Sequence, residues 1–144
     1  MVRVQIGFFE KADFDEAANA LSFCVKDAKR ELLEYMQNPS VVIFTAKENA
    51  FCAIAIVMLT DDFADLIDIA VLQKERRRGI AEKLLLHIFD FCRQKGVLNL
   101  LLEVRESNAP AISLYEKCGF EKINVRKKYY SDPLEDAVIY RREL

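Results

Sequence analysis

The chain has 144 residues, and its 21 basic and 23 acidic side chains give a net charge of −2 at pH 7. This length and a composition of 52% hydrophobic and 31% charged residues fit one globular domain, residues 1–144. The near-neutral balance gives no general reason to bind nucleic acid or an anionic membrane. Neither a signal peptide nor an apolar stretch of about 20 residues that could cross a bilayer is evident. We therefore expect a cytoplasmic protein.

The metal-ligating residue types are few and scattered. Cys24, Cys52, Cys92 and Cys118 never fall at a Cys-x-x-Cys spacing, and His87 is the single histidine. This set offers little for a zinc site, so no metal is expected. The apolar neighbours of the cysteines favour small core residues in a reducing compartment, with a catalytic cysteine as the alternative. We expect His87 on the surface of a helix.

The first half of the chain predicts one strand, two helices and a hairpin. Residues 2–9 are rich in β-formers, and residues 13–23 and 27–37 space their apolar side chains at helical intervals. Asp13 is a candidate cap of the first helix. The apolar runs 41–46 and 50–60 flank a short polar turn, which is typical of two paired strands.

The second half alternates strands and helices. A strand at 66–72 precedes the clearest helix, residues 79–94, which Lys95 and Gly96 end. The continuous apolar run 97–104 suits a buried strand. Asn108 or Ser107 is expected to cap the next helix, which has Pro110 in its first turn, and strands follow at 120–130 and 137–142. The order β-α-α-β-β-β-α-β-α-β-β predicts a mixed α/β layer fold.

The turn between the strand at 66–72 and the long helix is a candidate phosphate site. It reads Arg76-Arg77-Arg78-Gly79-Ile80-Ala81. Free N–H groups and the helix dipole at a helix start attract anions, and Gly79 allows close approach to the backbone. The alternative is an ordinary turn with three solvated arginines. The absence of a Gly-Lys-Ser/Thr or Gly-x-Gly-x-x-Gly pattern disfavours nucleotide hydrolysis and Rossmann-type redox chemistry.

Two spaced motifs give a resemblance to a known family. Arg76, Gly79 and Ala81 fill the pattern Gln/Arg-x-x-Gly-x-Gly/Ala, and residues 108–120 follow Asn-x-x-Ala-x-x-Leu-Tyr-x-x-x-Gly-Phe. In both, the chain resembles the GNAT superfamily of N-acetyltransferases. The resemblance implies a mostly antiparallel mixed sheet of about seven strands flanked by about four helices. It also implies acetyl-CoA as the donor substrate.

Within this superfamily the sequence is most similar to the RimI type, which acetylates the N-terminal alanine of a small-subunit ribosomal protein. Residues 102–108, 126–130 and 135–137 carry this similarity, whereas the first 60 residues match in element order only. The Pro-Trp step usual between the first two helices is absent, and residues 23–26 read Phe-Cys-Val-Lys. The alternatives are an enzyme that acetylates a small-molecule amine or a lysine side chain, and a non-catalytic module that binds acyl-CoA.

The resemblance also assigns residues to the donor. Ile69, Ala70 and Val71 would pair their backbone with the pantetheine arm, and Asn108 and Tyr115 would contact the coenzyme. The pyrophosphate would lie against the turn and first helical residues, namely Arg76, Arg77, Arg78, Gly79, Ile80, Ala81 and Glu82. Glu82 stands where an arginine is common in the family.

Two residues are the candidates for proton transfer. Glu103 lies in a very apolar strand, where a carboxylate needs a partner or a function. The resemblance makes it the general base, acting directly or through water; the alternative is a salt bridge with Arg105 or another cation. The resemblance makes Tyr115 the general acid, since a phenol of pKa ~10 holds its proton more firmly than a thiol of ~8.5; the alternative is a core tyrosine. Tyr129 and Tyr130 either line an acceptor channel or simply pack.

Overall fold

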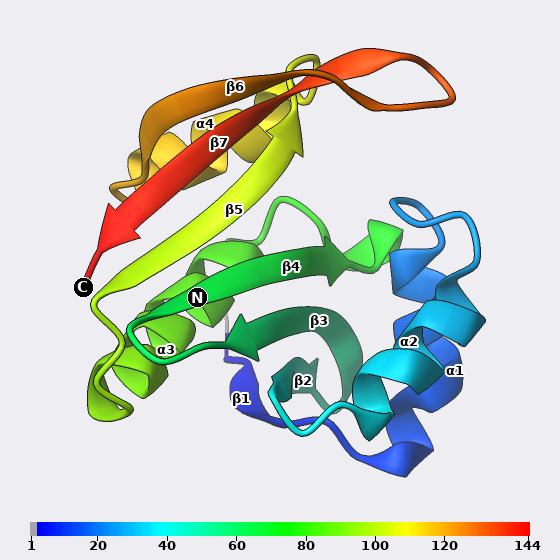
Figure 1. The fold of residues 1–144 in the computed structure, drawn as a ribbon. Coiled ribbons are helices and arrows are strands. Elements are labelled where there is room, and N and C mark those ends of the chain that lie inside the picture. The colour runs from blue at the N-terminus through cyan, green and yellow to red at the C-terminus, as the bar shows by residue number, and fades with distance from the viewer. Residues whose placement is uncertain (1–2) are drawn as a thin grey trace.

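A seven-stranded sheet organises the protein. The computed structural model describes residues 3–144, so the start of the strand predicted at 2–9 lies outside the described residues. The strand order is β1-β2-β3-β4-β5-β7-β6, as Figure 1 shows. The strands are β1 Gln5–Phe8, β2 Val41–Glu48, β3 Ala50–Leu59, β4 Phe63–Val71, β5 Asn99–Arg105, β6 Glu121–Tyr130 and β7 Glu135–Glu143. Neighbours pair antiparallel except β4 with β5, so the predicted fold class is confirmed.

Helices cover both faces of this sheet. The helices are α1 Phe14–Leu21, α2 Ala28–Gln37, α3 Ile80–Gln94 and α4 Ala109–Lys117, with short 3-10 turns η1 Lys11–Asp13 and η2 Gln73–Glu75. Helices α3 and α4 lie on one face, and α1 and α2 pack against the other. No helix of residues 3–144 is long and apolar enough to cross a membrane.

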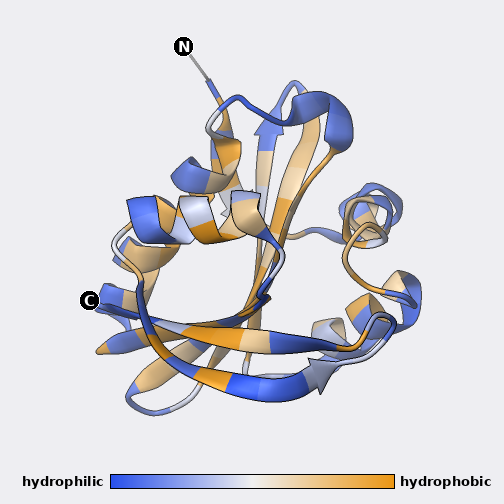
Figure 2. Cartoon of the chain, turned by 90° about the horizontal axis from the view of Figure 1, so that it is seen from above, coloured by the Kyte–Doolittle hydropathy of each residue, from blue (hydrophilic) through white to orange (hydrophobic). Residues whose placement is uncertain are grey.

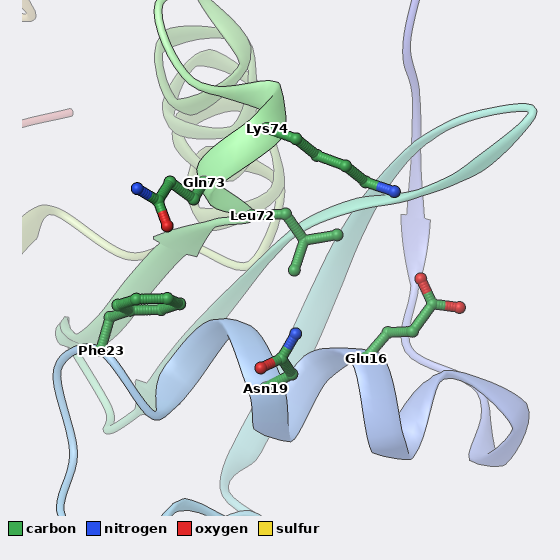
Figure 3. A pocket seen from close by; sticks show the side chains of 6 residues that line it. All are labelled: Glu16, Asn19, Phe23, Leu72, Gln73 and Lys74. Carbon is green, nitrogen blue, oxygen red and sulfur yellow. The ribbon is translucent and has the colours of Figure 1, made fainter.

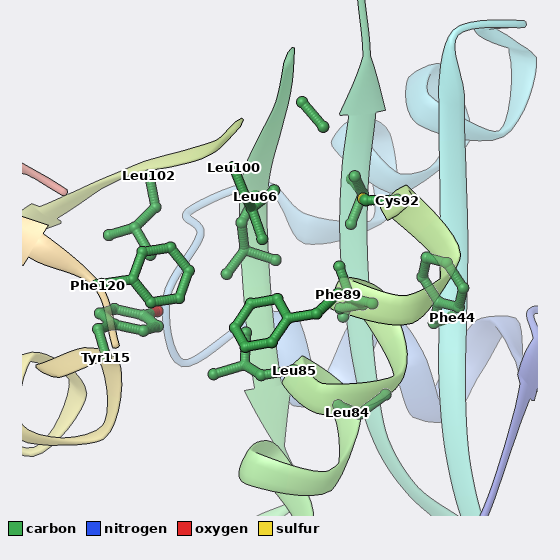
Figure 4. Packing of buried hydrophobic residues seen from close by; sticks show 14 of the residues in the cluster. Phe44, Leu66, Leu84, Leu85, Phe89, Cys92, Leu100, Leu102, Tyr115 and Phe120 are labelled. Carbon is green, nitrogen blue, oxygen red and sulfur yellow. The ribbon is translucent and has the colours of Figure 1, made fainter. Parts of the chain in front are cut away.

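The alternation of side chains along the central strands creates two apolar layers. On β3, Ile54 and Ile56 join the cluster under α1 and α2, whereas Ala55 and Val57 join the cluster under α3. Figure 4 shows the second cluster, in which Leu85 and Phe89 of α3 pack beside strand residues. Figure 2 shows the same pattern as hydrophobic colour along the central strands and hydrophilic colour on the loops.

Most of the predicted helix ends are confirmed. Gly79 and Gly96 bound α3 with φ of 74° and 79°, the left-handed region that favours glycine. Asn108 caps α4, since its Oδ1 accepts a hydrogen bond from the Ala111 N–H at 3.3 Å. The prediction for Asp13 is wrong in detail. Its side chain accepts no bond from α1; it accepts the Glu10 N–H and pairs with Lys47 at 2.9 Å, which ties η1 to the sheet.

The sheet opens between β4 and β5. Their parallel pairing covers Phe63–Asn99, Ala64–Leu100 and Asp65–Leu101 and then stops, after which the strands diverge (Figure 1). The divergence begins where β4 carries a β-bulge, because Val57 pairs with Leu66 while Ile56 pairs with Asp68. A bulge strengthens local twist and turns a strand away from its neighbour. We call the space between residues 66–71 of β4 and 102–105 of β5 the β4–β5 opening.

Candidate active site

The free backbone edge of β4 faces the β4–β5 opening. The Leu72 N–H donates to the Cys52 carbonyl on β3 at 2.9 Å, so by strand alternation the Ala70 N–H also points to β3. Ile69 and Val71 therefore direct their backbone groups toward the opening, where β5 no longer pairs with them. Of the three strand residues predicted for the pantetheine arm, these two are oriented to form backbone hydrogen bonds there.

The turn before α3 presents free N–H groups. The N–H of Lys83 is bonded to the Gly79 carbonyl at 3.1 Å. The four N–H groups that precede it, from Gly79 to Glu82, have no intrahelical acceptor. Arg77 and Gly79 both adopt left-handed φ, at 64° and 74°. Backbone donors gathered at the positive end of a helix dipole suit a pyrophosphate.

The three arginines of this turn have different environments. The Arg78 guanidinium pairs with Glu48 of β2 at 2.5 Å and also with Glu75 of η2. Its charge is therefore balanced by two carboxylates, and it anchors the turn to the sheet. Arg76 and Arg77 are exposed at the edge of the turn. The arrangement favours the backbone, rather than the Arg78 side chain, as the phosphate ligand.

Glu82 links the two helices that flank the opening. Its carboxylate pairs with Lys117 of α4 at 3.0 Å. An acidic side chain in the first turn of α3 is favourable for the helix dipole. The lysine brings a cation beside Glu82, and the separation of 35 residues along the chain hid this contact from sequence reasoning.

Glu103 lies on the face of β5 that points away from α3 and α4, because Leu102 and Val104 point into the cluster under those helices. Its Oε1 accepts a hydrogen bond from Arg126 at 2.9 Å. Its Oε2 is buried and has no hydrogen-bond partner within residues 3–144. Arg105, the cation suggested by sequence, pairs with Glu135 at 3.3 Å instead. A buried carboxylate oxygen without a donor requires an explanation, and a ligand provides one.

Tyr115 approaches the opening from α4. It is 7% exposed, and its ring packs edge-on against Phe120 at 5.6 Å. Burial, and to a smaller extent the charge of Asp68, hold the pKa of Tyr115 above its usual value. In Figure 4 the hydroxyl points away from α4 toward the strand that carries Leu66, and no hydrogen bond within the described chain engages it. The phenol thus keeps its proton and directs it toward the opening.

The comparisons with known proteins agree with this geometry. The acetyltransferase (GNAT) family model matches residues 8–120. The chain belongs to the GNAT acetyltransferase family. It is 45% identical over 89 residues to the [ribosomal protein bS18]-alanine N-acetyltransferase of Escherichia coli K12, a match that spans 60% of each chain. It is 36% identical over 129 residues to the putative [ribosomal protein bS18]-alanine N-acetyltransferase of Bacillus subtilis, which covers 86% of this chain and 82% of that one.

A solved structure extends the likeness over the full fold. The crystal structure of the ribosomal-protein-S18-alanine N-acetyltransferase from Escherichia coli superposes with a TM-score of 0.89 at 32% identity. The superposition covers 98% of this chain and 94% of the other. The region before residue 60, which sequence matched in element order only, therefore has the same architecture.

Asp68 was not among the site residues predicted from the sequence of this GNAT protein. Burial, and to a smaller extent the charge of Glu31, raise the pKa of Asp68 to about 7. The charge of Asp68 in turn raises the pKa of Tyr115 and of Cys24, after burial as the main cause for both. Asp68 therefore lies close to the opening. A lone aspartate in an apolar strand was the available signal.

Tyr129 and Tyr130 lie beside Glu103. Burial, followed by the charge of Glu103, raises the pKa of both tyrosines, and that of Tyr130 to about 12; for Tyr129 the closeness of its hydroxyl to the Glu103 carboxylate adds to the rise. The guanidinium groups of Arg126 and Arg105 lie over the two rings, each 4.4 Å from a ring centre. The two tyrosines therefore lie beside Glu103, and their role as the lining of an acceptor channel stays a prediction.

Two loops flank this side of the GNAT fold. Lys26 of the α1–α2 loop and Asp132 of the β6–β7 turn are 3.7 Å apart, and both are highly exposed. Such an exposed pair contributes little stability. Cys24 is exposed in the first loop, so its prediction as a core residue is wrong, whereas Cys52 and Cys92 are buried as predicted. His87 is exposed on α3, as predicted.

A pocket of about 610 Å³ lies beside the opening, between α1 and the end of β4. Figure 3 shows its lining side chains, which are Glu16, Asn19, Phe23, Leu72, Gln73 and Lys74. Phe23 is 58% exposed and lies under the Arg76 guanidinium at 5.2 Å. Phe23 belongs to residues 23–26, the stretch that the sequence has in place of the expected Pro-Trp step.

Proposed function

We propose that the protein transfers the acetyl group of acetyl-CoA to the N-terminal amine of a protein, specifically the N-terminal alanine of ribosomal protein bS18. The two relatives bear this activity in their names, and one matches 86% of the chain. We further propose that residues 1–144 act as one domain in the cytoplasm, where ribosomal proteins are made.

The donor binds along the β4 edge and the turn before α3. The pyrophosphate takes the N–H groups of Gly79 to Glu82, and the pantetheine arm extends along the edge of β4 at Ile69 and Val71. A strand N–H directed at the thioester oxygen stabilises the charge that develops there. Asn108, at the start of α4, closes the other side. Holding the two substrates together lowers the barrier by several kcal/mol, on the order of 7 to 11 at best.

The chemistry is a direct transfer. Glu103 takes one proton from the incoming ammonium, and the neutral amine nitrogen attacks the thioester carbon. The new C–N bond forms, the C–S bond breaks, and the leaving thiolate takes the proton of the Tyr115 hydroxyl. The acetylated nitrogen releases its second proton to water, the Tyr115 phenolate regains a proton from water, and Glu103 gives up its own proton to solvent, so the reaction releases one proton in total. A base and an acid on opposite sides of the opening can serve both ends of the same reaction without competing for one proton.

The buried, unpaired Oε2 of Glu103 is the observation that carries this proposal. Arg126 occupies the other oxygen and fixes the orientation of the carboxylate. One oxygen is therefore held in place, and the other remains available to a proton donor. An ammonium group that arrives through the acceptor side supplies that donor.

The test is mass spectrometry of amines incubated with acetyl-CoA. A peptide that carries the alanine-starting terminus of bS18 and an internal lysine is compared with the same peptide blocked at its N-terminus, and with spermidine. We expect one acetyl group on the free α-amine and none on the blocked peptide. Acetylation of spermidine or lysine alone favours a small-amine or lysine acetyltransferase. Binding of acetyl-CoA without any turnover favours a non-catalytic module.

A further inference from the structure

A second carboxylate lies on the same side of the opening as Glu103. Leu66 and Ile69 of β4 pack into the cluster under α3, whereas Ile67 and Ala70 pack under α1 and α2. The β-bulge lies between these residues, and Asp68 is two positions before Ala70. By strand alternation it shares the face of Ala70, which is the face that Glu103 occupies on β5.

Asp68 faces groups that are neutral or negatively charged. They come from α2, the α1–α2 loop, α4 and β6 and are Glu31, Tyr35, Cys24, Tyr115 and Tyr130. No cation of residues 3–144 forms an ion pair with Asp68, although twelve other carboxylates of that part of the chain have one. A half-buried acid without a cation is costly, and a cationic ligand would offset that cost.

We propose that Asp68 binds the ammonium form of the acceptor amine and positions it between β4 and β5 for Glu103. This assignment rests on the proposed function and adds a residue to its acceptor site. Asp68 on β4 and Glu103 on β5 flank the opening on the same side of the sheet. Asp68 holds the ammonium through a charged hydrogen bond. One proton passes to Oε2 of Glu103, and the amine nitrogen then attacks the thioester.

This role predicts a particular pH dependence. A carboxyl group that titrates near neutral pH binds an ammonium well only above its own pKa, which burial raises to about 7 here. The KM for the acceptor is therefore expected to rise as the pH falls from 8 to 6, while the KM for acetyl-CoA stays constant. Glu103 affects the chemical step, so the two carboxylates separate into a KM effect and a kcat effect.

The experiment compares Asp68→Asn with Asp65→Asn. Asp65 is the comparison, because it lies on the same strand and face but where β4 and β5 still pair; burial, and then the charge of Glu103, raise its pKa. Steady-state kinetics with the bS18 peptide and acetyl-CoA are measured from pH 6 to pH 8.5. Loss of a charged hydrogen bond predicts a rise of about 10- to 100-fold in the peptide KM of Asp68→Asn at pH 8.

The outcomes separate the inference from the proposed function. We expect the acceptor KM of Asp68→Asn to be high and independent of pH, with a wild-type KM for acetyl-CoA. Asp65→Asn should keep the wild-type acceptor KM and its pH dependence, because any effect of Asp65 through Glu103 appears in kcat. An active wild type together with an unchanged peptide KM and pH dependence in Asp68→Asn overturns the inference alone. A wild type that modifies neither the peptide nor spermidine overturns the proposed function and, with it, the role of Asp68.

Discussion

Glu103 and Tyr115 reach the β4–β5 opening from different sides of the sheet. Glu103 points toward the α1 and α2 side, whereas Tyr115 belongs to the cluster under α3. If the base and the acid lay on the same side of the sheet, both would be within reach of the amine and of the thiolate. Their separation by the plane of the sheet assigns the amine to one side and the thiolate to the other. Single-atom changes at each residue can test this assignment.

Tyr115→Phe tests the acid. The change removes one hydroxyl that has no hydrogen bond in the described structure, so we expect the stability to remain within about 1 kcal/mol of the wild type. We expect kcat to fall by about 100-fold or more, with coenzyme A binding retained. Single-turnover kinetics and calorimetric titration with coenzyme A measure the two effects.

Tyr140→Phe is the matched control for that change. Tyr140 is also buried, but its hydroxyl donates to Glu116 at 3.0 Å. Its loss should lower stability by about 1 kcal/mol and leave kcat unchanged. Normal turnover of Tyr115→Phe would contradict the acid assignment.

Glu103→Gln tests the base. Glutamine can remain in contact with Arg126, so the site keeps its shape while losing the proton acceptor. We expect the largest loss of rate at mildly acidic pH, where the amine is mostly protonated and a base is most needed, since an α-amine has a pKa of about 7.7 to 8.0. The measurement is the pH dependence of kcat. A profile parallel to that of the wild type would count against Glu103 as the base.

At the scale of elements, the start of α3 combines conformational strain with ligand binding. Gly79 has a φ of 74°, and a Cβ there would meet nothing within 4 Å. Gly79→Ala therefore costs only left-handed strain, about 1 to 2 kcal/mol. Because the same turn directs N–H groups toward the pyrophosphate, we also expect a higher KM for acetyl-CoA.

Gly96 provides the control at the other end of the same helix. It has a φ of 79° and equally open surroundings, but it lies at the end of α3 remote from the turn. Thermal unfolding should show a similar loss of stability for Gly79→Ala and Gly96→Ala. Only the first should raise the KM for acetyl-CoA. Equal KM values in both variants would show that the turn does not hold the pyrophosphate.

The elements themselves follow closely from local sequence. The predicted helix at 79–94 begins one residue later, and the predicted strand at 120–130 begins one residue later as well. Apolar periodicity, glycine at helix ends and proline in a first turn are local signals, so the sequence carries them directly. The bulge at Ile67 is different, because it depends on the register of β4 with β3, which local sequence does not encode.

The site could be predicted from the sequence only in part, because its motif residues are visible in the sequence but the contacts between distant residues are not. The resemblance identified Glu103 and Tyr115 as candidates, and the structure shows both at the opening. The partner of Glu103 is Arg126, 23 residues away, rather than the nearby Arg105. The surroundings of Asp68 and the pairing of Glu82 with Lys117 depend on how α2 and α4 pack on the sheet. The sequence shows Asp68 only as a lone aspartate in an apolar strand, and it carries no signal for the pairing.

At the scale of the whole molecule, Asp68 makes stability depend on pH. Its folded pKa of about 7 lies above the ordinary value of 3.8, so the folded state binds more protons than the unfolded state between these values. Stability from this group is fully present below about pH 4 and is lost as the pH rises through 7. The penalty above pH 7 is at most about 4 kcal/mol. Asp68→Asn should therefore melt at a higher temperature than the wild type at pH 8, with the difference shrinking toward pH 4.

Asp136 provides a control of opposite sign. The N–H of Lys128 donates to its Oδ1 at 2.8 Å, and this bond, with the nearby Lys127 ammonium, holds the pKa of Asp136 below its usual value. That group stabilises the fold above its unfolded pKa, so Asp136→Asn should lower the melting temperature at pH 8. Differential scanning calorimetry of both variants from pH 4 to pH 8 measures these shifts. If Asp68→Asn melts below the wild type at pH 8, the Asp68 carboxylate already has a partner in the free protein, and its role in binding the ammonium loses its physical basis.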